Sequence, residues 1–367
     1  MARFLTCWRH RALCDDEAIP LGVVGQPPQS NDFLKTKFVE GRPLQSFWTP
    51  PKDLGVPALA MAACLVLSGC GSGGGAVQSA GTGSTSNPPS TTQPPVTGSG
   101  GGSAPGTPAP KSAKRGIAYD LASPADLAVL SPGVSWWYNW SPSPNASVPS
   151  DYATRYAMDF YPMLWNGSFN ANSFVTFMKA NPGIKYMLVL NEPNLVGQSN
   201  MTPQKAAQLW PQYEAIAAQT GVKIVGPAIT WGTMTGYEDP VVWLDAFYAA
   251  YHGANGNRDP QIDYLAFHWY DYGLDAQLNR LTKYNKPFWV TEFANWHSQS
   301  DGAQIDTLAK QEAQMTSMVA TCEGRADVFR YAWFTGRWNP DPHFTSLLGG
   351  DGVLTDLGKL YLTLPAQ

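Results

Sequence analysis

The carboxyl-terminal two-thirds of the sequence, residues 114–367, predicts an α/β fold of the (β/α)8, or TIM-barrel, class. The segment contains 254 residues, which is close to the usual size of such a barrel. Eight short apolar runs alternate with longer segments of helical period, and this pattern is typical of parallel βα units. No glycine-rich phosphate-binding turn follows any of the eight runs, which argues against an open doubly wound sheet.

The eight runs are rich in β-branched or aromatic residues, and we predict that each forms a strand. In chain order they are RGIAYD (115–120), GVSWWYNW (133–140), DFYPMLW (159–165), KYMLVLNEPN (185–194), KIVGPAIT (223–230), DYLAFHWYD (263–271), PFWVTEF (287–293) and VFRYAWF (328–334). Their number matches the eight strands of a complete barrel.

Helical segments are predicted between several of the strands. The helix after the fourth strand has the clearest ends, because Thr202 and Pro203 supply a cap and a first-turn proline and Gly221 supplies a stop. The predicted helical segments are 173–181, 202–221, 239–253, 301–324 and 355–364.

The residues before the barrel have a different composition. Residues 71–113 consist almost entirely of Gly, Ser, Thr, Pro and Ala, so they cannot bury a core and are predicted to form a flexible linker. A linker of roughly forty residues has a typical end-to-end reach of about 35 Å. The catalytic domain is therefore assigned to residues 114–367.

A short apolar run, LGVPALAMAACLVLSGC, lies directly before the linker and follows Lys52. It is too short to span a bilayer and fits the apolar region of a secretory signal, so residues 51–70 are predicted to be a signal peptide. Its end resembles a bacterial lipobox, in which Cys70 would be lipidated and would anchor a secreted cell-envelope lipoprotein to the membrane. The alternative is an ordinary signal peptide cut at a nearby small residue.

Residues 1–50 show no clear apolar period and stand before a signal that normally begins a protein. We interpret them as an over-extended gene start or a disordered leader. A cytoplasmic extension before an uncleaved anchor is the alternative, and the brevity of the apolar run argues against it.

Cysteine content and charge exclude several classes of protein. Only Cys322 of the five cysteines lies after the linker, so the folded part can form no internal disulfide, and Cys322 is predicted to be a buried structural thiol. The net charge of −4 is small, and no basic patch argues for a nucleic-acid partner. The oligomeric state has no signal in the sequence.

Two glutamates follow buried strands directly, Glu192 after the fourth and Glu292 in the seventh. Barrel active sites lie at the carboxyl ends of the strands, and a carboxylate at the edge of an apolar core is costly unless it is functional or paired. Hydrolysis of a glycosidic bond uses two such groups, held about 5 to 5.5 Å apart in retaining enzymes. We predict that this pair is catalytic, whereas the structural alternative is that one glutamate caps a helix.

The two roles follow from the neighbours of each glutamate. Glu192 is predicted to be the general acid/base, because the amide of Asn191 beside it could donate a hydrogen bond to a sugar 2-hydroxyl. Glu292 is then the nucleophile, ionised at neutral pH while Glu192 keeps its proton.

The motifs NEPN and TEF at these strand ends resemble the catalytic signatures of the large clan of (β/α)8 retaining glycosidases. Within that clan the sequence is similar to glycoside hydrolase family 128, through WWYNW, FYPMLW, LVLNEPN, FHWYD and FWVTEFA. The resemblance covers residues 114–367 and none of the leader. It implies an endo-acting β-1,3-glucanase that uses Glu192 as acid/base and Glu292 as nucleophile, with no metal or organic cofactor.

Aromatic residues support a sugar substrate, since 12 of the 14 tryptophans fall in the barrel segment and pyranose faces stack on such rings. Core packing is the alternative for any single ring. Trp140 and Trp333 are the preferred candidates for the floor of the cleaved subsite, because strand-end tryptophans commonly take that place in this clan. The full set of aromatic candidates is Trp140, Trp231, Trp269, Tyr270, Trp296 and Trp333.

Two further polar residues are candidates for substrate binding. His268 and Tyr270 alternate on the sixth strand, so both can point to one face and orient Glu292. A metal role for His268 is not expected, because the other barrel histidines show no ligand spacing. Asn139 beside Trp140 could bind a sugar hydroxyl or simply form a turn.

Two other functions remain open. The same residues could act on another β-linked polymer such as mannan, β-1,4-glucan or xylan, or transfer a glycosyl unit to a sugar acceptor. A surface lipoprotein that binds oligosaccharides without cleaving them is the alternative from another class. The presence of both glutamates argues against a non-catalytic binding protein, because such a protein would be expected to have lost one of the two carboxylates.

Overall fold

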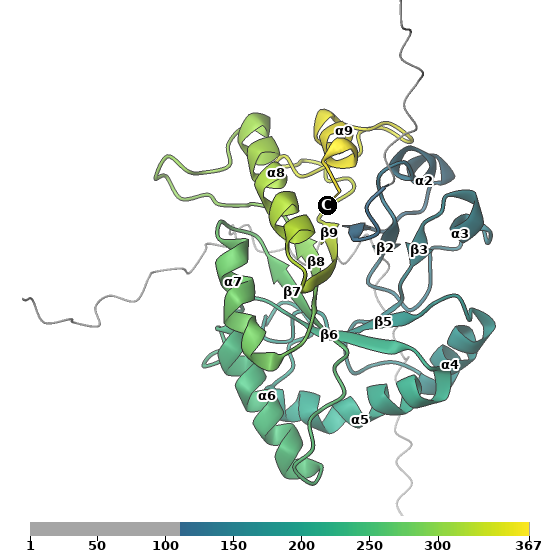
Figure 1. The fold of residues 1–367 in the computed structure, drawn as a ribbon, viewed down its shortest axis with the longest axis vertical. Helices are drawn as coiled ribbons and strands as arrows, with labels where there is room; N and C mark the ends of the chain where they lie inside the picture. The colour runs from purple at the N-terminus through teal and green to yellow at the C-terminus, as the bar shows by residue number, and fades with distance from the viewer. Residues whose placement is uncertain (1–110, 367) are drawn as a thin grey trace, which may run out of the picture. The chain divides into compact units, whose positions relative to one another are not determined.

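The computed structural model describes residues 111–366, and within that range the chain forms one curled sheet of nine parallel strands surrounded by helices (Figure 1). The strands are β1 (Arg115–Ala118), β2 (Trp136–Tyr138), β3 (Asp159–Phe160), β4 (Met163–Leu164), β5 (Tyr186–Val189), β6 (Lys223–Ile229), β7 (Tyr264–Trp269), β8 (Phe288–Phe293) and β9 (Val328–Trp333). The helices are α2 (Pro124–Leu130), α3 (Tyr152–Arg155), α4 (Ala171–Ala180), α5 (Pro203–Thr220), α6 (Pro240–Ala254), α7 (Leu274–Leu281), the 3-10 helix η1 (Thr282–Tyr284), α8 (Leu308–Gly324) and α9 (Asp356–Thr363).

All eight predicted strands are present, but the third is divided into β3 and β4. β3 pairs with β2 and β4 pairs with β5, so these two short strands stand at opposite ends of the order β3-β2-β1-β9-β8-β7-β6-β5-β4. Only Tyr161 and Pro162 separate them, and Pro162 has no N–H to give to a neighbouring strand. Because one short segment joins both ends of the order, the sheet curls round into a barrel-like fold.

Helices cover the outside of the sheet (Figure 1), and the side chains of the strands are mostly buried. Every residue of β8 is buried, and so is every residue of β6 after Lys223. Large rings fill one end of the barrel, where Trp289 packs 5.0 Å from both Trp136 and Tyr186, measured between ring centroids. Burying about 200 Å² of such a ring contributes about 5 kcal/mol of transfer free energy before entropy is counted.

The predicted ends of α5 are confirmed. The Thr202 hydroxyl accepts a hydrogen bond from the Lys205 backbone N–H at 3.3 Å, Pro203 is the first helical residue, and Gly221 ends the helix at φ 75°. A left-handed C-cap of this kind favours glycine, which has no Cβ to clash. The helix predicted over 301–324 is shorter, because α8 begins at Leu308 after the cap residue Thr307.

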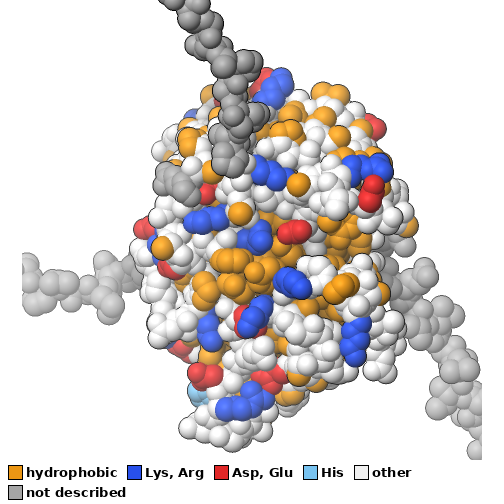
Figure 2. Space-filling model, turned by 45° about the vertical axis from the view of Figure 1, so that its right-hand side comes forward, with side chains coloured by type: hydrophobic (Ala, Val, Ile, Leu, Met, Phe, Trp, Pro, Cys, Tyr) orange, Lys and Arg blue, Asp and Glu red, His pale blue; other side chains and the backbone are white. Residues whose placement is uncertain are grey.

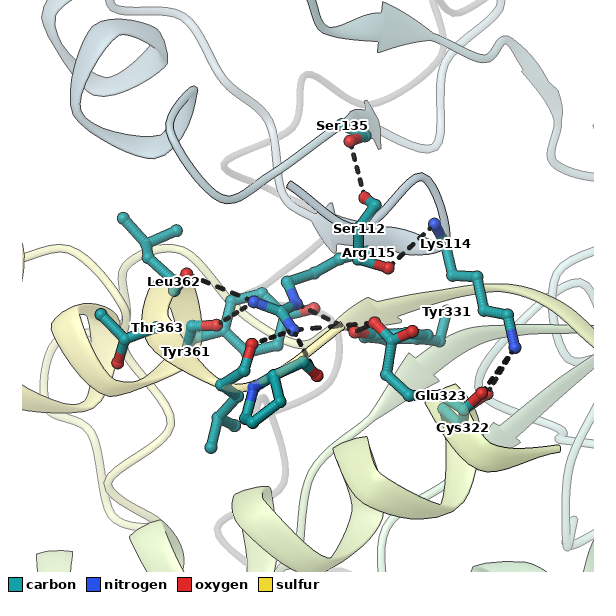
Figure 3. A network of polar contacts seen from close by, with 12 residues as sticks. Ser112, Lys114, Arg115, Ser135, Cys322, Glu323, Tyr331, Tyr361, Leu362 and Thr363 are labelled. Atoms are coloured by element: carbon teal, nitrogen blue, oxygen red, sulfur yellow. Dashed lines mark hydrogen bonds and ion pairs between the residues drawn. The ribbon is translucent and has the colours of Figure 1, made fainter. Parts of the chain in front are cut away.

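Arg115, the first residue of β1, is a buried cation that joins both ends of the described chain (Figure 3). Its guanidinium donates hydrogen bonds to the Tyr331 hydroxyl at 2.9 Å and to the backbone oxygens of Tyr361 at 2.8 Å and Leu364 at 2.7 Å. The buried Glu323 carboxylate lies 3.6 Å away and balances the charge. The last carbonyls of α9, which have no partner inside the helix, are thereby satisfied.

The domain begins earlier than its predicted boundary at residue 114. The Lys111 ammonium donates to four backbone oxygens at 2.6 to 3.3 Å, those of Ser131, Val134, Tyr156 and Ala157. Ser112 is buried, and its backbone oxygen accepts a hydrogen bond from the Ser135 hydroxyl at 2.7 Å. Residues 111–113, predicted as linker, therefore belong to the folded domain.

The remaining predictions for the leader, including the signal at 51–70 and lipidation of Cys70, lie outside the described residues. Among the helices of residues 111–366, none combines the length and apolar character needed to cross a membrane. Cys322 is free and buried, as predicted, and burial raises the pKa of its thiol. On the face in Figure 2 acidic and basic side chains are scattered, and apolar side chains gather near its middle.

Candidate active site

Glu192 follows β5, and Glu292 lies within β8, both at the carboxyl ends of their strands. The backbone turns sharply at Leu190 and Glu192, which have φ values of 53° and 45° in the left-handed region that residues with a Cβ seldom adopt. A hydrogen bond of 2.8 Å from the Glu192 N–H to the Ala228 oxygen on β6 holds this turn. Strained backbone of this kind is often found where a side chain must be aimed at a functional site.

The two carboxylates are close together and buried. One oxygen of Glu192, one oxygen of Glu292 and one ring nitrogen of His268 all lie within 4.8 Å of one another. Glu192 is 2% exposed and Glu292 is fully buried. Two carboxylates held this close and this deeply buried repel each other strongly when both are charged.

Three neutral donors surround the carboxylate of Glu292. Its Oε1 accepts hydrogen bonds from the Tyr138 hydroxyl at 2.9 Å and the Trp140 indole N–H at 2.8 Å, and its Oε2 accepts one from the Tyr270 hydroxyl. Burial, followed by the charge of Glu292, raises the pKa of Tyr138 and of Tyr270 well above the usual value. Both phenols therefore stay protonated and stabilise the carboxylate.

His268 lies between the two glutamates on β7. Its Nδ1 is 3.0 Å from Glu192 Oε1 and 3.4 Å from Glu292 Oε2, and its Nε2 is 2.9 Å from the Thr291 hydroxyl. His268 and Tyr270 therefore both reach Glu292. The three ligand atoms of Glu192, His268 and Glu292 are also close enough to hold a small cation, although the histidine already has a hydrogen-bond partner at each nitrogen.

A group of aromatic rings lies beside Glu292. Tyr270 stacks on Trp296 with ring centroids 3.9 Å apart, and Phe334 packs 5.8 Å from Tyr270 and 5.6 Å from Trp296. Trp140 lies 5.9 Å from Phe334, so the group reaches the residue that contacts the Glu292 oxygen. The rings of Trp140, Tyr270 and Trp296 are partly buried and can stack on a pyranose face, whereas Phe334 is buried behind them.

Trp333 lies in the core rather than in this group. It is fully buried, its indole N–H donates to the Thr345 oxygen at 2.8 Å, and its ring packs 5.2 Å from Phe293. The core-packing alternative therefore describes Trp333. The ring that the end of β9 places beside Tyr270 and Trp296 is its neighbour, Phe334.

Three other candidates for sugar binding, Trp231, Trp269 and Asn139, have hydrogen-bond partners within the protein. The Trp231 indole donates to Gln277 at 3.0 Å and lies under Arg280, and Trp269 donates to the Tyr272 oxygen at 2.9 Å. The Asn139 oxygen accepts from the Ser141 N–H at 3.2 Å, so the turn-forming alternative describes this side chain.

Four residues of the site were missed in the sequence: Tyr138, Thr291, Phe334 and Gln198, which accepts a 3.1 Å hydrogen bond from Asn191. Tyr138 had a usable signal, because it precedes Trp140 by two positions in WWYNW and so can share its face. Thr291 directly precedes Glu292, and its contact with His268 depends on the pairing of β8 with β7, which no motif reveals.

The comparisons with known proteins agree with this geometry. A family model described as the glycosyl hydrolase catalytic core matches residues 116–361, and the chain is a glycoside hydrolase. A solved endo-β-1,3-glucanase of family 128, subgroup II, from Pseudomonas viridiflava is 65% identical, with a TM-score of 0.70 over 70% of this chain and all of the other. The chain belongs to glycoside hydrolase family 128.

Two more solved structures of that family are similar. A subgroup II endo-β-1,3-glucanase from Sorangium cellulosum is 34% identical, with a TM-score of 0.58 over 69% of this chain and 99% of the other. A subgroup I enzyme from Amycolatopsis mediterranei, in complex with laminaritriose, is 26% identical, with a TM-score of 0.53 and the same coverage. A curated relative, alkali-sensitive linkage protein 1 of Schizosaccharomyces pombe, is 28% identical over 267 residues, or 69% of this chain, which spans only 45% of that protein.

Proposed function

We propose that this glycoside hydrolase is a retaining endo-β-1,3-glucanase in which Glu192 is the acid/base and Glu292 the nucleophile. The observation that carries the proposal is the placement of one oxygen of each carboxylate within 4.8 Å of the other. Retaining enzymes need a short separation, because the second carboxylate attacks the sugar directly, whereas inverting enzymes leave room for a water. The fold is then a (β/α)8 barrel whose third strand is interrupted at Tyr161 and Pro162.

In the first step the ionised Glu292 attacks the anomeric carbon while Glu192 gives its proton to the leaving oxygen. Tyr138, Trp140 and Tyr270 hold Glu292 in a fixed direction before the reaction. The glycosidic bond breaks, a sugar hydroxyl leaves with the proton, and a glycosyl ester forms on Glu292.

In the second step Glu192, now ionised, takes a proton from water as the water attacks the glycosyl ester. The product leaves with its original anomeric configuration, Glu292 is released as a carboxylate, and Glu192 has its proton again. The Nδ1 of His268 is near one oxygen of each glutamate, so it can donate to whichever of the two is ionised. No step requires a metal or an organic cofactor.

A β-1,3-glucan substrate is supported by two relatives more than 30% identical, both described as endo-β-1,3-glucanases. The decisive measurement is product release from laminarin, curdlan, mannan, xylan and carboxymethylcellulose, with Glu192→Gln and Glu292→Gln as controls. We expect oligosaccharides from laminarin or curdlan alone, and none with either variant. Release from another polymer would contradict the substrate, and binding without turnover on any of them would favour the glycan-capture function.

We also propose that the protein is secreted and anchored through a lipid on Cys70. This rests on the sequence of residues 51–70 and the Gly-rich segment after it. Incorporation of labelled palmitate by the native chain, and its loss with Cys70→Ser, is the expected result. Labelling that persists in Cys70→Ser would place the lipid elsewhere.

A further inference from the structure

His297 follows β8 and lies between the carboxylates of two aspartates. Its ring Nδ1 is 3.0 Å from Asp271 Oδ1, and its ring Nε2 is 3.0 Å from Asp301 Oδ2. The side chain is 10% exposed, so water has little access to replace either partner. A neutral imidazole has one N–H, whereas an imidazolium has two. Both aspartates can therefore accept a hydrogen bond only while His297 carries a proton on each nitrogen.

The two aspartates come from different segments at the carboxyl ends of the strands. Asp271 is the second residue after β7, and Asp301 belongs to the segment 298–306 that follows His297. The Asp301 Oδ1 accepts a hydrogen bond from the Ala303 N–H at 2.8 Å. This N–H, followed by the hydrogen bond with His297, lowers the pKa of the Asp301 carboxyl, so the group is ionised at neutral pH. His297 thus joins the loop after β8 to the end of β7.

Two rings of the candidate site lie beside this junction. Tyr270 and Trp296 each directly precede one member of the pair formed by Asp271 and His297. The Trp296 N–H donates to the Tyr270 backbone oxygen at 2.8 Å, and the two rings stack with their centroids 3.9 Å apart. The Tyr270 hydroxyl donates to Glu292. A displacement of His297 from Asp271 would therefore disturb the stacked rings and a donor to the catalytic carboxylate.

Other titratable side chains near His297 have different partners. The Tyr272 ring packs 5.4 Å from His297, and burial raises the pKa of its phenol, which stays neutral. The Lys310 ammonium of α8 pairs with Asp306 at 2.9 Å. His343 stacks on the neighbouring tryptophan, and burial lowers its pKa, so that ring is neutral at neutral pH. Within residues 111–366 the ring nitrogens of His297 therefore bond to the two aspartates alone.

We propose that His297 is a positioning residue that, as an imidazolium, holds the loop after β8 against the end of β7 and keeps Trp296 stacked on Tyr270. This inference rests on the proposed function. When the ring loses a proton, one nitrogen presents a lone pair to a carboxylate oxygen 3.0 Å away, and the two repel. The ring then leaves one aspartate, and the stacked pair beside it loosens. His297 takes no part in proton transfer to the substrate.

Asp301→Asn separates this role from general support of the loop. The two oxygens of Asp301 have different partners, so the variant can keep an oxygen on the Ala303 N–H and turn its amide Nδ2 towards His297 Nε2. A neutral ring then donates to Asp271 from Nδ1 and accepts from the amide at Nε2. The junction between the two loops therefore no longer depends on a second proton.

The assay is hydrolysis of a dinitrophenyl β-laminaribioside by the full chain from about pH 6 to about pH 9. Dinitrophenolate leaves without taking a proton, so the protonation of Glu192 does not limit kcat/KM for this substrate. We expect kcat/KM of the native chain to fall about tenfold towards the alkaline end of this range. In Asp301→Asn it should change by less than about threefold over the same range.

Two histidine variants complete the test. His297→Gln removes one of the two donors at every pH, so its kcat/KM at neutral pH should be about tenfold below the native value. His252→Gln is the matched control, because His252 also pairs with an aspartate, Asp259 at 2.6 Å, but lies on α6. This control should keep the native kcat/KM and the native pH profile.

An equal alkaline fall in the native chain and in Asp301→Asn would overturn the role of the protonated ring. So would the absence of any fall in the native chain, a loss of activity in Asp301→Asn at every pH, or native kcat/KM in His297→Gln. If His297→Gln does not fold, the comparison of the native chain with Asp301→Asn still decides the question. Absence of turnover by the native chain at every pH would instead contradict the proposed function, so the two failures are distinguishable.

Discussion

Tyr138 provides the sharpest test of the role that we propose for Glu292. The residue is fully buried, so Tyr138→Phe removes only the hydroxyl that donates to Glu292 Oε1 at 2.9 Å. A hydrogen bond to a charged group contributes about 1.5 to 3 kcal/mol, which corresponds to a loss of roughly 10- to 150-fold in kcat/KM. Trp140 and Tyr270 still donate to the same carboxylate, so we expect a loss near the lower end, about tenfold.

The pH dependence of Tyr138→Phe has a defined sign. Loss of a donor makes the ionised form of Glu292 less stable, so the carboxylate takes up a proton at a higher pH than in the native enzyme. The acidic limb of the plot of kcat/KM against pH therefore moves to higher pH. The assay is hydrolysis of an aryl laminarioligosaccharide over a series of buffers, with thermal unfolding measured in parallel.

Tyr361→Phe is the matched control. Its hydroxyl is also buried and donates to the Gly116 backbone oxygen at 2.7 Å, at the amino end of β1. We expect this variant to lower the Tm and to leave kcat/KM and the pH profile within about twofold of the native values. A native pH profile and native kcat/KM in Tyr138→Phe would refute the role given to its hydroxyl.

Three further predictions concern the metal, the core and the aromatic group. Excess chelator should leave hydrolysis unchanged, and a requirement for added metal would count against the proposed mechanism. Arg115→Met should lower stability by about 3 to 5 kcal/mol because it leaves the buried Glu323 charge unpaired, and denaturant unfolding should show part of that loss restored in Arg115→Met/Glu323→Gln. Phe334→Ala should lower kcat/KM about tenfold while Trp333→Phe mainly lowers the Tm, and the reverse pattern would restore Trp333 to the substrate site.

The strands were predictable because parallel strands buried on both faces are continuous apolar runs. Helix α5 was predictable because its capping residues Thr202, Pro203 and Gly221 act locally. The start of the domain could not be predicted, because Lys111 is held by backbone oxygens 20 to 46 positions away in the sequence. Such contacts have no local pattern in a segment of small and polar residues.

Only part of the candidate site could be predicted from the sequence. The proximity of Glu192 and Glu292 could be predicted because both follow apolar runs, and the carboxyl ends of barrel strands meet at one face. The exchange of Trp333 for Phe334 could not be found, because β9 has one extra residue between Val328 and Arg330 in its pairing with β8. A shift of one residue turns every following side chain to the other face of a sheet, and only the structure shows where it occurs.

The contacts of Lys111 and Arg115 have a practical consequence for immobilising this enzyme or fusing it to another protein. Arg115, at the amino end of β1, donates a hydrogen bond to the Leu364 oxygen, so the first strand and the end of the last helix of the domain lie together. Glu192 and Glu292 stand at the opposite, carboxyl ends of their strands. A solid support, a second enzyme or a carbohydrate-binding module joined to the domain just before Lys111 or just after Leu364 would therefore leave the approach of a long polymer to the glutamates unobstructed.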